Sequence, residues 1–284
     1  MSTMRVHWRP GFAWLKLLLV VVVFVVALGV GITLIDWARR ASEVKLTMSN
    51  LSQCAKAVHL CHDNNKKFPP YYGQYGGSSG PVTFHAHLLP FVDELKLYTY
   101  VAGIYPPPHW NVAASEVPSF LSNLDPTQWQ YPGGAYFGKC NFPVNLRLFY
   151  TEGGLGTLST SADLIYPRMP TSFEKDGTSH TLLFATKYGI CGPGASYWLD
   201  PDHNAPTSVT AATFGVSMQL WQQAPPSNVC DPRAGTAVSF RPGYIQVAMC
   251  DASVRTVAVG VSQATWQAAH TPNAGDKLGS DWDQ

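Results

Sequence analysis

The sequence predicts an α+β fold, in which one long N-terminal helix is followed by a β-rich domain. Two observations carry this prediction. Residues 17–35 form an uncharged apolar run near the N-terminus, and after Pro70 the chain changes to short apolar segments separated by turn residues. The composition agrees, because 24 Gly and 22 Pro in 284 residues suit a fold of many short strands and turns.

The apolar run is long enough to cross a membrane. At about 1.5 Å per residue, a helix over residues 17–35 spans roughly 28 Å, close to the hydrocarbon thickness of a bilayer. Arg5, Arg9 and Lys16 precede it without an acidic residue, as in membrane-inserted segments. The alternatives are a buried core helix and a cleaved secretory signal. The first normally keeps a polar face, and the second needs a small-residue cleavage site, which residues 36–40 lack.

The helical pattern continues beyond the apolar run. Apolar residues recur every three or four positions from Val44 to Cys61, as on one face of a helix, and the pattern stops before Pro69. We therefore predict one helix from Phe12 to about Lys67. The expected organisation is a short basic cytoplasmic segment (1–16), a transmembrane helix (17–35), its continuation (36–67) and a β-rich domain outside the cytoplasm (68–284).

A β-hairpin is the clearest element of the predicted domain. Residues 244–250 and 253–259 are two alternating runs that flank Asp251 and Ala252. A two-residue type I′ turn would place Ala252 at positive φ, at a cost of roughly 1 kcal/mol. The alternative is a turn of another geometry. Residues 181–185 (TLLFA), which follow an Asp-Gly turn, predict another strand.

The six cysteines leave the compartment and the pairing open. They lie at positions 54, 61, 140, 191, 230 and 250, without the close spacing of a zinc site. An even number permits disulfides in an oxidising compartment, but six cysteines allow 15 pairings, and a fully reduced set is the alternative.

The charge and the motifs argue against several functions. A formal net charge of +1, with 13% charged residues, indicates no basic surface for nucleic acid. No nucleophile motif stands out, so we expect neither an enzyme nor a cofactor. The candidate metal ligands are His59, His62 and Asp63 at helical spacing, Asp200 and Asp202 in a Pro-rich loop, and His85 and His87, which alternate on a predicted strand. Bonds from the histidines to backbone, and turn capping by the aspartates, are the alternatives.

Aromatic residues gather between positions 105 and 137. Trp110, Trp129, Tyr131 and Tyr136 all lie in this segment, which is also rich in Pro and Gly. Such residues line a carbohydrate groove when exposed, because sugars stack on aromatic faces, or they pack in the core. A stalked domain that binds a glycan or another solute is therefore the alternative function.

Several segments, in order along the chain, resemble the DUF1559 family of pilin-like or pseudopilin-like proteins, which are abundant in planctomycetes. The N-terminal matches are Gly11-Phe12, the apolar helix, Asn50-Leu51, His59, His62-Asp63 and Phe68-Pro69-Pro70. Further matches are residues 88–91, residues 117–121, Asp176-Gly177 with residues 178–181, residues 230–232, and a C-terminal signature that contains Arg241 and Asp251. The resemblance implies a prepilin-type N-terminus, with cleavage after Gly11 and a methylated Phe12.

The chain departs from this family pattern at positions that matter. Lys16 stands where an assembling pilin has the acidic residue that pairs with a neighbour's terminal amine, which argues against filament assembly. Beside Trp14, Lys16 fits the cytoplasmic interface of a permanent anchor, so we expect the N-terminus inside. The signature's His is Arg241, and its Asp-Gly is Asp251-Ala252, for which a turn role is expected.

The sequence thus predicts a single-pass protein of the cytoplasmic membrane whose C-terminal domain is periplasmic or extracellular. It is expected to act by binding or assembly, without catalysis. The expected partners are the lipid bilayer, other pilin-like subunits, secretion or pilus machinery, or a glycan. A metal-dependent enzyme that uses the candidate ligands is the least favoured alternative.

Overall fold

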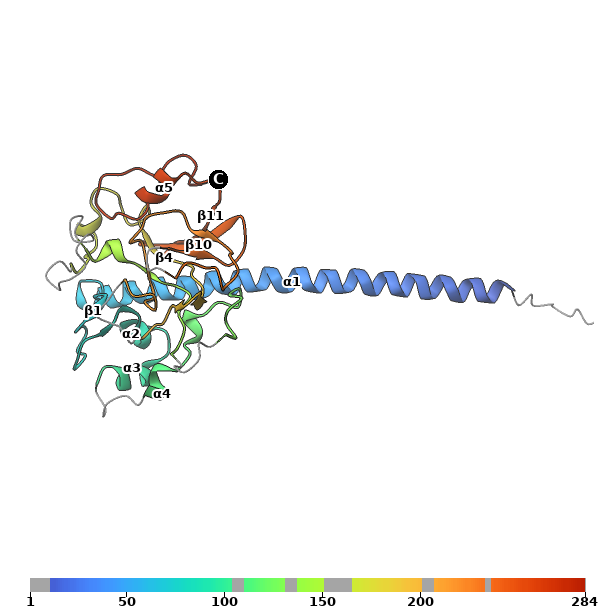
Figure 1. Cartoon of the computed structure of the whole chain (residues 1–284), viewed down its shortest axis with the longest axis horizontal. Helices are drawn as coiled ribbons and strands as arrows, with labels where there is room; N and C mark the ends of the chain where they lie inside the picture. Colours follow the sequence, from blue (N-terminus) through green and yellow to red (C-terminus); the bar gives the residue numbers. More distant parts are fainter. Residues whose placement is uncertain are drawn as a thin grey trace, which may run out of the picture. The chain divides into compact units, whose positions relative to one another are not determined.

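The computed structural model describes residues 11–103, 110–130, 137–150, 165–200, 207–232 and 236–283. The chain divides into two compact units, Met1–Lys45 and Leu46–Gln284. Helix α1 (Gly11–Asn65) runs through both (Figure 1). Its observed bounds agree with the helix predicted over residues 12–67.

In the first unit the apolar side chains of α1 are exposed. Every large apolar residue from Trp14 to Trp37 is at least half accessible to solvent. Within the described ranges, α1 is the one helix that is long and apolar enough to cross a membrane. A soluble helix normally buries one face, whereas residues 14–37 of α1 bury none within the described part of the chain.

The second unit is built on a five-stranded sheet with the order β11-β10-β4-β3-β7. Neighbouring strands are antiparallel, except that β3 and β7 are parallel. The strands are β3 (Val144–Asn145), β4 (Leu182–Ala185), β7 (Thr213–Phe214), β10 (Tyr244–Met249) and β11 (Val254–Ala258). The α+β class predicted from the sequence is confirmed.

Short elements surround this sheet. The paired strands outside it are β1 (Tyr72–Gly73) with β2 (Val82–Thr83), β5 (Ile190–Cys191) with β6 (Gly194–Ala195), and β8 (Gln222–Gln223) with β9 (Val238–Ser239). The helices are α2 (Phe84–Leu88), α3 (Leu95–Val101), α4 (Trp110–Ala113) and α5 (Gln263–Ala268). The 3-10 turns are η1 (Leu89–Phe91), η2 (Pro118–Phe120), η3 (Leu146–Leu148) and η6 (Thr171–Phe173).

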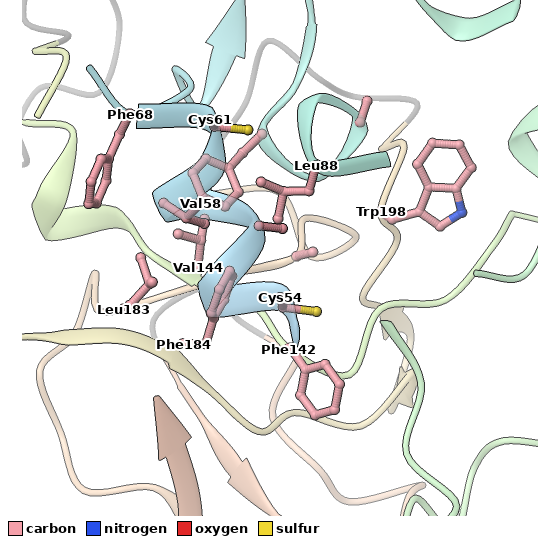
Figure 2. Packing of buried hydrophobic residues seen from close by; sticks show 14 of the residues in the cluster. Cys54, Val58, Cys61, Phe68, Leu88, Phe142, Val144, Leu183, Phe184 and Trp198 are labelled. Atoms are coloured by element: carbon pink, nitrogen blue, oxygen red, sulfur yellow. The ribbon is translucent and has the colours of Figure 1, made fainter. Parts of the chain in front are cut away.

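The sheet separates two apolar clusters. Alternate residues of β10 point to opposite faces, so Ile245 and Val247 lie in one cluster and Ala248 in the other. The first cluster contains Trp266 of α5, and the second contains the buried stripe of α1. Figure 2 shows that stripe, with Val58 on the side of Val144, Leu183 and Phe184 of the sheet. The sulfur atoms of Cys54 and Cys61 point the other way, toward the side of Leu88 and Trp198. The body is therefore a layer of α1, a sheet, and a layer of α5.

Residues 84–88 are helical, which corrects the strand expected around His85 and His87. The Thr83 hydroxyl accepts a hydrogen bond from the Ala86 N–H and caps the N-terminus of α2. Both imidazoles are buried, and each bonds a backbone carbonyl: His85 that of Phe142 and His87 that of Gly73. They stabilise the core and do not share an open face.

The predicted hairpin is present, and its turn has the alternative geometry instead of type I′. Ala248 pairs with Val254, and the Ala252 N–H donates to the Met249 carbonyl at 3.0 Å. The loop therefore holds three residues, with Ala252 in the left-handed region at φ 64°. Asp251 closes it by accepting a hydrogen bond from the Ser253 N–H at 2.8 Å. The turn role expected for Asp251 fits this geometry.

Because Ala252 adopts a conformation that suits glycine, we expect Ala252→Gly to stabilise the protein by about 0.5–1 kcal/mol. The midpoint of thermal unfolding should rise by a few degrees, measured by circular dichroism. Ala248→Gly is the matched control, since Ala248 is extended and buried in β10 and its replacement should destabilise. An equal loss of stability in both variants would contradict the strain at Ala252.

Among the described cysteines, one pair is oxidised. Cys191 and Cys230 form a disulfide across 39 residues, while Cys54, Cys61, Cys140 and Cys250 are free and buried. Burial raises the pKa of all four thiols, and that of Cys140 to about 12. These thiols behave as small core residues, since little reactive thiolate forms.

Candidate functional site

The helical trio His59, His62 and Asp63 is not assembled into a metal site. The His59 Nε2–H donates to the Cys250 carbonyl at 2.9 Å, whereas His62 Nε2 accepts from the Met169 N–H at 3.1 Å. Asp63 is exposed, and its carboxylate lies 3.8 Å from His62 Nδ1. Across the described part of the chain, no group of three or more His, Cys, Asp or Glu could hold a metal ion. The two histidines attach α1 to distant segments of the body.

Several family-signature positions converge at the tip of the β10–β11 hairpin. The Asp251 N–H donates to the Thr178 carbonyl at 3.1 Å, beside Gly177, whose φ is 84°. Asp176 accepts hydrogen bonds from the N–H groups of Ala274 and Gly275, at 2.8 and 2.7 Å. Because His59 bonds the adjacent Cys250 carbonyl, these signature residues join four distant segments. Their role in the structure is to fix the hairpin on the helix.

Arg241 and Asp251 lie at opposite ends of β10. Arg241 precedes β10 and bridges to Tyr244, whereas Asp251 follows the strand's other end. Six strand residues at about 3.4 Å each separate them by roughly 20 Å. Arg241, which stands at the position of the signature's His, therefore lies at one end of the hairpin. Asp251 makes its turn contacts at the other end.

The remaining predicted positions do not form a centre. Asp200 is buried and accepts a hydrogen bond from the Thr210 hydroxyl at 2.7 Å, and Asp202 lies outside the described residues. Gly11 and Phe12 are in the first turns of α1. Trp14 is 72% exposed on the same helix.

Sequence reasoning missed a groove that lies within the second unit. Its volume is about 380 Å³, and it lies between Leu46, Asn50 and Gln53 of α1 and residues 116–123. The Asn50 amide donates to the carbonyls of Pro118 and Leu121, at 3.1 and 3.0 Å. Both sides of the groove are segments that match the family pattern, Asn50-Leu51 and residues 117–121. Asn50 and Pro118 are 68 residues apart in the sequence, so their contact could not be inferred from the sequence alone.

A set of buried ionisable groups was also missed. Asp125 accepts hydrogen bonds from Thr127, Asn141 and Gly189, and burial raises the pKa of its carboxyl. Lys187 is fully buried, and desolvation lowers its pKa to about 8. Lys139, also buried, is paired with Glu116 at 3.8 Å. These groups organise the loops around β5, and their hydrogen bonds are structural.

The groove combines polar and apolar side chains. The groove presents amides, a hydroxyl and one carboxylate over apolar Leu46 and Leu121, without a nucleophile and base in contact.

A model of the family described as "Protein of unknown function (DUF1559)", SBP_bac_10, matches residues 38–263, about four fifths of the chain. No curated protein and no solved structure matches the chain.

Proposed function

Since the chain belongs to the DUF1559 family, we propose that it is a membrane-anchored, pseudopilin-like surface protein that acts by assembly or binding, without catalysis. The family match begins at residue 38 and covers the body, so the anchor is argued from α1 itself. The observation that carries the proposal is the exposed apolar surface of α1 before Asp36.

Two tryptophans support the membrane location. Trp14 and Trp37 flank the apolar segment and are 72% and 71% exposed. At about 1.5 Å per residue they are roughly 34 Å apart, which places one ring at each interface of a bilayer. Lys16 lies beside the first ring, and Arg39 and Arg40 follow the second. Basic side chains at both ends extend their charges into the headgroup region.

The N-terminus inside, with the body periplasmic or extracellular, is part of the same proposal. The disulfide between Cys191 and Cys230 supports an oxidising location for the body, because such bonds are rare in the cytoplasm. Lys16 is basic and lacks the negative charge that is needed to pair with a neighbour's terminal amine. The anchor is therefore proposed to stay in the membrane, where contacts with pilin-like subunits or secretion machinery involve the body.

We expect the chain to sediment with membranes, to resist alkaline carbonate and to be released by detergent. Mass spectrometry of the mature N-terminus gives the decisive detail. A methylated Phe12 would establish prepilin-type processing, and an intact Met1 would indicate an unprocessed anchor. A soluble chain that begins beyond residue 36 would contradict the anchor altogether.

A second candidate, a stalked domain that binds a glycan, is favoured by one described residue. Trp129 is 80% exposed at the surface of the body. Tyr131 and Tyr136, and the side chain of Trp110, lie outside the described residues. The case for this candidate therefore depends on the surroundings of Trp129.

A further inference from the structure

Trp129 is more exposed than any other large apolar side chain in the described part of the chain. It lies in the loop formed by residues 125–130, which precedes the bridge residue Lys139 in the second unit. Exposing an indole forfeits the burial that stabilises most tryptophans. Tryptophan is enriched among the residues that contribute most of the binding energy in protein interfaces.

The backbone on both sides of Trp129 is held by one buried lysine. Lys139 Nζ donates to the carbonyl of Gln128 and, at 3.1 Å, to that of Gln130. Asp125 fixes the start of the same loop by accepting hydrogen bonds from the Thr127 N–H and hydroxyl, at 2.9 and 2.8 Å. The loop is thus ordered before any ligand arrives, which reduces the entropic cost of binding.

A second ordered loop, residues 226–230, adjoins the first. The Gln130 amide donates to the Ser227 hydroxyl at 3.3 Å. The Ser227 carbonyl accepts from the Gly192 N–H at 2.6 Å, and Cys230 is joined by the disulfide to Cys191. We call the surface formed by residues 125–130 and 226–230 the Trp129 ledge.

The chemistry of this ledge suits a neutral ligand. Its exposed polar side chains are the amides of Gln130 and Asn228, and its one charged residue, Asp125, is buried. Anionic headgroups and nucleic acids need basic side chains, which the two loops lack. Amides both donate and accept hydrogen bonds, as sugar hydroxyl groups require, and the flat faces of pyranose rings pack on an aromatic face.

We propose that the Trp129 ledge binds a neutral polysaccharide, with the indole as a stacking platform and the neighbouring amides as hydrogen-bonding partners. This inference rests on the proposed function only in that the protein acts by binding, and it does not depend on the anchor. It gives the extracytoplasmic body a neutral matrix or cell-surface glycan as its target.

The test is co-sedimentation of the full-length protein with insoluble cellulose, chitin and β-1,3-glucan. The detergent must lack a sugar headgroup, since that group would compete for the ledge. We expect the wild-type chain to bind at least one polysaccharide and Trp129→Ala to weaken that binding at least tenfold. Trp129→Phe should retain most of it, because a flat ring remains. Leu95→Ala is the control, since it removes an exposed apolar side chain of the body outside the ledge and should leave polysaccharide binding unchanged.

The proposal is overturned if no polysaccharide retains the wild-type chain, or if Trp129→Ala binds as well as the wild type. A dimer that forms without polysaccharide and is lost in Trp129→Ala would assign the ledge to a second copy, which also rejects it. Trp129→Ala should still sediment with membranes. Failure of the ledge is therefore distinguishable from failure of the anchor, which only the carbonate extraction reports.

Discussion

Acidification from pH 7 to pH 4 is expected to remove most of the body's stability. Three buried histidines, His85, His87 and His270, have pKa values that desolvation lowers from 6.5 to about 4. Above pH 6.5 each is neutral in both the folded and the unfolded chain. Below it, the unfolded chain binds protons that the folded chain cannot accept until about pH 4.

The size of this effect follows from the shifts. A shift of about 2.5 units corresponds to roughly 3 kcal/mol per histidine at pH 4, so three together approach 10 kcal/mol. This is comparable with the whole stability of an ordinary domain. The raised pKa of Asp125 acts in the opposite sense, since its folded carboxyl binds a proton more readily than the unfolded one, and it offsets part of the loss.

Chemical denaturation of the full-length chain in detergent between pH 7.5 and 4.5 checks this expectation. The free energy of unfolding should fall with a slope that approaches 4 kcal/mol per pH unit near pH 5. His87→Gln should reduce that slope by about a third, whatever it does to stability at neutral pH. Leu88→Ala, which removes a buried side chain beside His87 that does not titrate, is the control and should leave the slope unchanged. A flat profile between pH 6.5 and 5 would show that the buried imidazoles are accessible to protons.

Replacing Leu51 by alanine is expected to cost about 2–5 kcal/mol. Leu51 is fully buried in the stripe of α1 that packs against the sheet and α2, and its truncation leaves a cavity in a closely packed core. For a body of this size, that loss lowers the unfolding midpoint by roughly 5–15 °C.

Leu60→Ala provides a control on the same helix with the same change of side chain. Leu60 is 47% exposed, so its truncation should change stability by no more than about 0.5 kcal/mol. Thermal unfolding of both variants, followed by near-ultraviolet circular dichroism, separates packing from helix propensity, because alanine favours helix equally at both positions. Equal melting temperatures would mean that the buried stripe of α1 does not hold the body together.

Elements whose signals are local could be predicted from the sequence alone. Residues 17–35 are apolar on every side, and the stripe from Val44 to Cys61 follows the helical period, so both halves of α1 were predictable. The alternating runs around Asp251 predicted the hairpin, and the ordered motifs predicted the family whose model matches residues 38–263. Periodicity and turn chemistry are properties of neighbouring residues, so they can be recognised in the sequence alone.

The roles of side chains whose partners are distant in sequence follow from the fold. His59 and His62 look like ligands at helical spacing, but their partners are Cys250 and Met169, 191 and 107 residues away. The alternation at His85 suggested a strand, and the cap from Thr83 and the surrounding core made it a helix. Nothing local shows that Lys139 holds the two carbonyls beside Trp129. Burial and hydrogen bonding across the chain gave these residues their roles, because a side chain's chemistry depends on which groups the fold brings within about 3 Å of it.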